Sequence, residues 1–272
     1  MVEVQSNMDK ISHNHTVIEQ FTKQAVPFTH ISQHSNQYGI DLMLRLSSPR
    51  QGDTVLDVAC GTGIVACEYA KLVNHVTGID LTPAMIEQAK ILQREKELDN
   101  IEWRTGDVSI LPFNDNSFSI VMTRYSFHHI HDPKVVLKEM KRVCKPCGKI
   151  LVTDVTPDSD KKNAYNHVEK LRDPSHTEAL TIEELRQMME SIGCINIRIE
   201  HHDLEMDLET ILQSSFPKQG DKDKIVQLFK QDLAVDHLGM RSYLKNDKIH
   251  FYFPVSMIIG TKETGYEGSQ TS

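Results

Sequence analysis

The chain has 272 residues, enough to bury a hydrophobic core without the help of disulfides. Hydrophobic residues make up 39% of it and charged residues 25%, which is ordinary for a soluble globular protein. The formal net charge of −8 argues against a protein that binds nucleic acid through its phosphates. The five cysteines are scattered and odd in number, which predicts reduced thiols and a cytoplasmic location.

The first 50 residues are helical in character and are expected to form a cap over the rest of the chain. Residues 8–46 carry most of this helical signal. The first 15 residues lack the basic and apolar regions of a signal peptide. The longest apolar run, residues 251–259, is too short to span a membrane, so no membrane association is expected.

Strand and helix patterns alternate from residue 53 to residue 155. The predicted strands are residues 54–58, 75–79, 101–104, 118–122 and 149–154. The predicted helices between them are residues 64–72, 83–98 and 133–143. This alternation predicts an α/β fold with a parallel sheet that carries helices on both faces. Such a sheet binds its ligands outside the carboxyl ends of the strands.

The rhythm changes after residue 155. Residues 156–180 are polar, a capping box at Thr181 opens a helix over residues 182–191, and a strand follows over 193–199. Residues 203–247 are predicted to be irregular helices, and 251–261 a last strand. We therefore expect one domain over residues 1–263, in which 156–263 supply substrate-side insertions, and a disordered tail over 264–272.

A glycine-containing turn follows the first predicted strand, with Gly61 and Gly63 at its centre. Such glycines let the backbone approach a ligand closely, and Asp80 stands at the end of the next strand, where a carboxylate can bind a ribose diol. Gly61, Gly63 and Ala66 also satisfy the loose dinucleotide pattern, so the glycines alone leave NAD open. The further acids Asp57 and Asp107 favour a cationic sulfonium ligand over a pyrophosphate.

Five segments in order over residues 53–155 resemble the motifs of class I S-adenosylmethionine (SAM) dependent methyltransferases. They are residues 57–63, 78–85, 106–113, 118–133 and 143–150. The resemblance is strongest to the small-molecule methyltransferases of ubiquinone and menaquinone biosynthesis. It implies a Rossmann-like fold with a mostly parallel sheet, an antiparallel last strand and helical lid insertions over a SAM-binding core at residues 53–155.

The resemblance also implies roles for individual residues around the cofactor SAM. Asp80 would bind the ribose hydroxyls, and Asp107 with the Val108 backbone would bind the adenine. Leu81 and Met85 would pack near the adenine ring. The methionine part would be lined by Ala59, Gly61 and Gly63 of the glycine turn, and Asp57 in the strand before it would also belong to the cofactor site. Arg124, at the end of the fourth predicted strand, is expected to bind oxygens of cofactor or substrate.

Methyl transfer from a sulfonium mainly requires alignment of the acceptor and exclusion of water. His128 and His129 are the candidate general bases, although either could instead hold the following loop together. Five further side chains are candidates for contact with the substrate, with ordinary packing or solvation as the alternative for each. They are Phe21, Phe28, Tyr125, His167 and His176.

No metal is expected. Cys144 and Cys147 have the spacing of half a zinc site, but no second pair stands at a suitable distance. The expected partner is therefore a small molecule that is methylated by SAM. Two alternatives remain at this point, a methyltransferase that acts on RNA or protein, and a non-methylating cyclase or sensor with the same fold. The oligomeric state and the identity of the acceptor cannot be read from the sequence.

Overall fold

The structure is a computed structural model that describes residues 2–35 and 37–264, with side chains over residues 8–27 and 37–264. Its centre is a parallel sheet made by five strands. These are β1 (Thr54–Val58), β2 (His75–Asp80), β3 (Ile101–Thr105), β4 (Phe118–Arg124) and β5 (Cys144–Val155). The alternation of strands and helices predicted for residues 53–155 is confirmed.

Two long strands complete the sheet beyond β5. β8 (Lys248–Lys262) runs antiparallel to β5 on one side and to β6 (Cys194–Asp207) on the other. The strand order is β3-β2-β1-β4-β5-β8-β6, and the short β7 (Tyr243–Lys245) pairs with the far end of β8. The prediction of a mostly parallel sheet with an antiparallel last strand is therefore confirmed.

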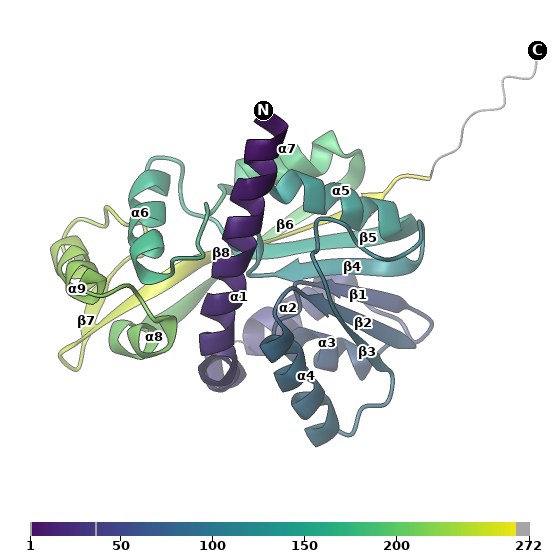
Figure 1. Ribbon diagram of the computed structural model, residues 1–272, viewed down its shortest axis with the longest axis horizontal. Helices are drawn as coiled ribbons and strands as arrows, with labels where there is room; N and C mark the ends of the chain where they lie inside the picture. Colours follow the sequence, from purple (N-terminus) through teal and green to yellow (C-terminus); the bar gives the residue numbers. More distant parts are fainter. Residues whose placement is uncertain (1, 36, 265–272) are drawn as a thin grey trace, which may run out of the picture.

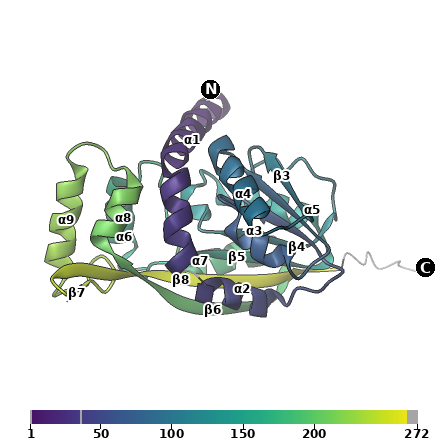
Figure 2. The same ribbon diagram turned by 90° about the horizontal axis from the view of Figure 1, so that it is seen from below.

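Helices cover both faces of the sheet (Figures 1 and 2). On one face, α2 (Gln37–Ser47), α3 (Ile64–Ala70) and α4 (Pro83–Glu95) bury an apolar cluster that includes Val55 of β1. α5 (Pro133–Val143) and α7 (Ile182–Ser191) bury a second cluster on the opposite face, around Leu56 and Val58. Among the described helices, none combines the length and apolar character that crossing a membrane requires.

A third apolar cluster lies where β6 and β8 extend past the parallel strands. α6 (Lys162–Arg172), α8 (Leu208–Ser215) and α9 (Asp221–Asp232) pack there, as Figure 2 shows along the length of β8. The long α1 (Val2–Ser35) stands between this cluster and the core, in contact with α4 and α8 (Figure 1). The fold thus places α1 over the carboxyl ends of the parallel strands.

The prediction of irregular helices over residues 203–247 is wrong at both of its ends. Residues 203–207 continue β6. In this part of the strand the exposed Asp203 and Glu205 alternate with the less exposed Leu204 and Met206. Residues 243–245 form β7. In the polar segment 156–180, residues 162–172 form α6. The tail predicted to be disordered lies, from residue 265 onward, outside the described residues.

Candidate active site

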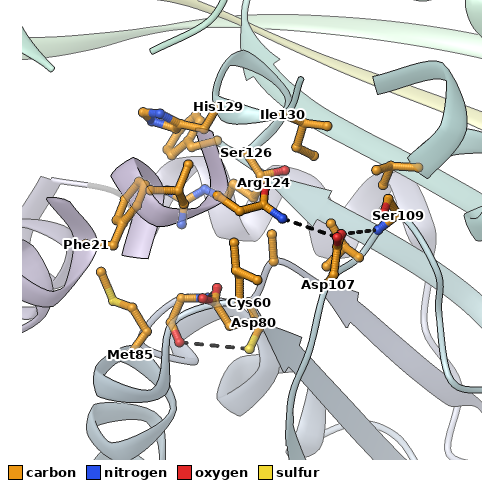
Figure 3. A pocket seen from close by; sticks show the side chains of 18 of the residues that line it. Phe21, Cys60, Asp80, Met85, Asp107, Ser109, Arg124, Ser126, His129 and Ile130 are labelled. Atoms are coloured by element: carbon orange, nitrogen blue, oxygen red, sulfur yellow. Dashed lines mark hydrogen bonds between the residues drawn. The ribbon is translucent and has the colours of Figure 1, made fainter. Parts of the chain in front are cut away.

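A cavity of about 350 Å³ lies at the carboxyl ends of the parallel strands, beneath α1. Figure 3 shows labelled side chains from α1, the turn after β1, the end of β2 and the end of β4 converging on it. The structure brings together most of the residues singled out in the sequence. Those that line the cavity are Phe21, Asp57, Ala59, Gly61, Asp80, Leu81, Met85, Asp107, Val108, Arg124, Tyr125 and His129.

The turn after β1 bends through three residues with positive φ, Ala59 at 56°, Gly61 at 53° and Gly63 at 76°. The two glycines serve different purposes. A Cβ on Gly61 would meet no atom within 4 Å, so its backbone faces open space in the cavity. A Cβ on Gly63 would lie 2.5 Å from the Trp103 ring, so this glycine permits close packing of α3 against β3. Gly61 is therefore the glycine that a ligand can approach.

Asp80 holds the turn in place from the end of β2. One of its carboxylate oxygens accepts a hydrogen bond from the Gly61 N–H at 2.8 Å, and the other accepts one from the Thr82 N–H at 2.8 Å. Burial raises the pKa of this carboxyl, and the hydrogen bonds from Thr82 and Gly61 oppose that effect. A ligand hydroxyl that reaches Asp80 meets a carboxylate whose orientation is already fixed.

Asp107 ties the loop after β3 to α1. Its carboxylate accepts a hydrogen bond from the Ser109 N–H at 2.9 Å, and Lys10 forms an ion pair with it at 3.0 Å. The Asn14 amide donates to the same oxygen as Lys10, at 3.2 Å. Burial raises the pKa of Asp107, but the hydrogen bonds from Ser109 and Lys10 outweigh it and the pKa is lowered. Asp107 is thus ionised, and α1 is anchored on it.

Three side-chain atoms of Asp57 and Arg124, two residues that line the cavity, are buried without hydrogen-bond partners among the described residues. They are the Oδ2 atom of Asp57 and the Nε and Nη2 atoms of Arg124. Burial raises the pKa of Asp57 to about 7, against the opposing charge of Arg124. Arg124 stacks 4.4 Å from the centre of the Tyr125 ring. Unpaired buried charges are costly, so this pair is suited to a ligand that carries both an ammonium and a carboxylate.

The two candidate histidines have different environments within the short helix η1 (Phe127–His129). The Nδ1 atom of His128 lies 2.5 Å from Oδ1 of buried Asp154, and His128 does not line the cavity. Burial lowers the pKa of His128, but the charge of Asp154 outweighs burial and the pKa is raised. His129 lines the cavity and meets the edge of the Phe21 ring, with ring centres 4.9 Å apart.

Comparison with known proteins matches residues 56–152 to the family described as "Methyltransferase domain". An uncharacterized methyltransferase of Bacillus subtilis, YcgJ, is 28% identical over 246 residues, which are 89% of this chain and 97% of YcgJ. The crystal structure of YcgJ superposes with a TM-score of 0.77 at 26% identity, covering 84% of this chain and 99% of YcgJ.

A ubiquinone/menaquinone biosynthesis C-methyltransferase, UbiE of Ruegeria sp., is 35% identical over 117 residues. These residues are 42% of this chain and 47% of UbiE, so the chain matches about half the length of that relative. The crystal structure of a putative methyltransferase from Bacillus halodurans superposes with a TM-score of 0.75 at 24% identity, over 84% of this chain and 100% of the other.

The chain is a class I SAM-dependent methyltransferase. The family match covers the strands and turns that build the cavity, from β1 to β5. The segment that the family model matches lies within residues 53–155, where the five sequence motifs also lie.

Four of the predicted site residues do not line the methyltransferase cavity. Gly63 packs on Trp103, and His128 pairs with Asp154, as described above. His176 is buried, with its Nε2 atom 2.6 Å from the Asn166 side-chain oxygen. His167 is exposed on α6, in a separate depression that α6 and α9 form. The side chain of Phe28 lies outside the described residues.

The structure also brings residues to the cavity that the sequence did not single out. Lys10, Asn14 and Val17 come from α1 and follow one another at helical spacing with Phe21. That spacing is the one signal by which they could have been found. Ser175, in the turn after α6, reaches His129 and is itself hydrogen-bonded to Asp173, and no local pattern marks either residue. Among the described residues, no group of three or more metal-ligating side chains is placed to hold a metal ion.

Proposed function

We propose that this methyltransferase transfers the methyl group of SAM to a small-molecule acceptor bound in the cavity beneath α1. The proposal is carried by the order in which charged side chains follow one another along the cavity. Ionised Asp107 and the carboxylate of Asp80 suit the adenosine part, while the unpartnered Asp57 and Arg124 suit the amino acid part. When bound, SAM supplies an electrophilic methyl group on a sulfonium.

Each residue has a distinct task in this proposal. Asp80 accepts hydrogen bonds from the ribose hydroxyls, and Leu81 and Met85 pack against the adenine, which Asp107 and Val108 bind at its polar edge. Ala59 and Gly61 border the methionine part. Asp57 receives the ammonium, and Arg124 donates to the carboxylate in the geometry that a guanidinium favours.

The acceptor is proposed to lie beyond the methionine part, against Phe21, Tyr125 and His129. In Figure 3 the Phe21 and His129 side chains lie across the cavity from Asp107, which is proposed to bind the polar edge of the adenine. Because α1 covers a cavity of about 350 Å³, the space suits a small acceptor better than a folded protein or RNA. The net charge of −8 also weighs against RNA.

The acceptor itself does not follow from the relatives. UbiE acts in quinone biosynthesis by its name, but the similarity covers 47% of it. The helices α6, α8 and α9 lie outside the matched family segment. We also propose a cytoplasmic location, in keeping with five cysteines that are all free thiols.

Titration calorimetry with SAM tests the proposal. Asp80→Ala removes the ribose-binding carboxylate, and charge-assisted hydrogen bonds contribute about 1.5 to 3 kcal/mol each, so SAM affinity should fall at least tenfold. Because Asp80 also holds the glycine turn, Arg124→Met serves as a second variant. The Nε and Nη2 atoms of Arg124 make no hydrogen bond to a described residue, and the same loss of affinity is expected from Arg124→Met.

Glu87→Ala is the matched control. Glu87 is an exposed carboxylate on α4 that pairs with Lys90, and SAM affinity should not change when it is removed. Wild-type protein that does not bind SAM, or Asp80→Ala and Arg124→Met variants that bind it as well as Glu87→Ala does, would contradict the proposal.

A further inference from the structure

A chain of hydrogen bonds runs from His129, at the cavity wall, into the protein interior. The Nδ1 atom of His129 lies 3.0 Å from the Ser175 hydroxyl oxygen. The Ser175 hydroxyl lies 2.6 Å from Oδ1 of Asp173. The other carboxylate oxygen of Asp173 accepts a hydrogen bond from the Gln24 side chain of α1 at 2.9 Å. Ser175 and Asp173 are both almost completely buried.

The direction of the protons in this chain follows from Asp173. The Ser175 N–H and the Ser175 hydroxyl donate to one oxygen of its carboxylate, and Gln24 donates to the other. Burial raises the pKa of Asp173, but the positive charges that His129 and Arg172 can carry and these hydrogen bonds outweigh burial, and the pKa is lowered. An ionised carboxylate can only accept hydrogen bonds. The single hydrogen of the Ser175 hydroxyl therefore points to Asp173, and the Ser175 oxygen accepts the Nδ1–H of His129.

This arrangement fixes the tautomer of His129. A neutral imidazole carries one N–H and one lone pair, so Nδ1–H leaves the lone pair on Nε2. The side-chain hydrogen bonds of the described residues engage Nδ1 of this ring and leave Nε2 without a side-chain partner, and the ring lines the cavity beside Phe21. The ring thus presents the unprotonated Nε2 atom to the space proposed for the acceptor.

The groups packed around the ring keep His129 neutral. Burial lowers the pKa of His129, and the positive charge of His128, whose ring centre is 4.2 Å away, lowers it further. The negative charge of Asp173 and a hydrogen bond with the Ser175 backbone raise the pKa, and the positive charge of Arg172, paired with Glu169 at 2.6 Å, lowers it again. The His176 ring, 6.2 Å away, is itself neutral because burial strongly lowers its pKa.

We propose that His129 is the general base for the methyl acceptor, that Ser175 and Asp173 are its positioning residues, and that the acceptor attacks through an oxygen that carries a proton, as in a phenol or an enol. This inference rests on the proposed function and deepens it. The hydroxyl proton passes to Nε2, an oxygen lone pair forms the new bond to the methyl carbon, and the electron pair of the broken carbon–sulfur bond stays on sulfur.

The charge that results is spread along the chain. Protonated His129 carries its positive charge next to Ser175, whose hydroxyl remains bonded to the negative Asp173. A positioned general base contributes about 10² to 10⁴ to the rate of a reaction with proton transfer when its pKa lies near the working pH. Because the surroundings lower the pKa of His129 to about 3, its contribution is expected at the lower end of this range. For an acceptor with no proton to lose, such as a tertiary amine, the chain offers no advantage.

The tautomer can be measured directly on the full-length protein labelled with ¹⁵N-histidine. Nitrogen shifts in a long-range correlation spectrum at pH 7 should show a neutral His129 protonated on Nδ1. The His129→Asn variant assigns the signal. Ser175→Ala removes the acceptor of the Nδ1 proton, so the same ring should shift toward the Nε2–H form. A protonated ring, or an Nε2–H ring in the wild type, would overturn the proposal.

A matched variant controls for the loss of a buried serine hydroxyl. Ser214 on α8 is also buried and donates only to helix carbonyl groups, so Ser214→Ala should leave the His129 tautomer unchanged. If Ser175→Ala leaves the spectrum as unchanged as Ser214→Ala does, Ser175 does not position the ring.

The catalytic part is tested with catechol and acetylacetone as probe acceptors and trimethylamine as the probe without an ionisable proton. Release of S-adenosylhomocysteine is expected with the first two. His129→Asn keeps a donor for Ser175 but has no Nε2, so its kcat should fall about 10² to 10⁴-fold while SAM affinity stays the same. Release with trimethylamine alone, or a His129→Asn variant with wild-type kcat, would overturn the assignment. SAM calorimetry on the same samples reports separately on the proposed function.

Discussion

Asp57 is the residue whose protonation should matter most for stability. Its carboxylate is 2% exposed, and burial raises its pKa from 3.8 to about 7. Between these values the folded state holds a proton that the unfolded state has lost. Stability from this group is therefore complete below pH 3.8 and is lost as the pH rises to 7.

The matched variant Asp57→Asn lacks this titration. The difference in unfolding free energy between the variant and the wild type should grow from pH 4 to pH 7 and then level off. A shift of this size corresponds to at most about 4 kcal/mol in favour of the variant. Denaturant unfolding at several pH values measures the difference, and a difference that does not vary with pH would contradict it. The variant should also bind SAM more weakly, because it lacks the negative charge that is proposed to bind the ammonium of SAM. The charge that lowers the stability of the free protein is thus the one that supports binding.

At the level of residues, the sequence was informative where function depends on position relative to a strand. Asp57, Asp80 and Asp107 could be predicted because each follows from a motif at a strand end. Asp173 and Ser175 could not, because their value depends on contact with His129 over 40 residues away in sequence. The same reason separates His129 from His128, which are adjacent in sequence and differ only in which neighbours they face.

The element that should respond most to SAM is α1. Lys10, Asn14, Val17 and Phe21 of this helix all line the cavity, so bound SAM is expected to require a docked α1. At a SAM concentration a hundred times Kd, the docked state gains about 2.7 kcal/mol. Tryptic cleavage after Lys10 and Lys23, which requires α1 to open, should then slow about a hundredfold. Timed digestion followed by mass spectrometry measures this.

The hairpin of β7 and β8 provides the internal control for this digestion. Lys245 and Lys248 are exposed there, at the far end of β8 from the parallel strands, and neither lines the cavity. Their cleavage rates should not change with SAM. Equal slowing at α1 and at the hairpin would indicate general stabilisation rather than docking of α1 on the ligand.

Elements were predictable where burial follows a simple period. The five parallel strands are short apolar runs, and α4 and α5 begin with a proline at their first turn, so both kinds stand out. α6 was missed because its buried side includes Asn166 and Glu169, which hydrogen bonds satisfy, and apolar spacing does not mark such a helix. The end of β6 was missed although Leu204 and Met206 alternate with polar residues, a weak signal over few residues.

At the scale of the whole molecule, β8 joins the cofactor core to the cluster of α6, α8 and α9. Its residues 255–261 pair with β5, and residues 250–262 pair with β6 along nearly the whole strand. The pairing of strands so distant in sequence could not be predicted from local patterns, which is why the sequence indicated the parallel core better than its extension. A continuous strand through both regions leads us to infer that they unfold together.

Trp103 makes this inference measurable, because it is the only tryptophan and lies on β3, at the opposite edge of the sheet from α9. Phe229 on α9 is 2% exposed in the third apolar cluster. Truncation of such a ring costs about 3 to 5 kcal/mol. If the chain unfolds as one unit, Phe229→Ala should lower the stability reported by Trp103 fluorescence in denaturant by that amount. Phe216→Ala, at a ring that is 40% exposed, should change it by less than about 1 kcal/mol.

The contrary result would be a Trp103 transition that Phe229→Ala leaves in place while circular dichroism shows an earlier loss of helix. It would mean that the cluster of α6, α8 and α9 unfolds on its own and that β8 does not couple it to the SAM-binding core.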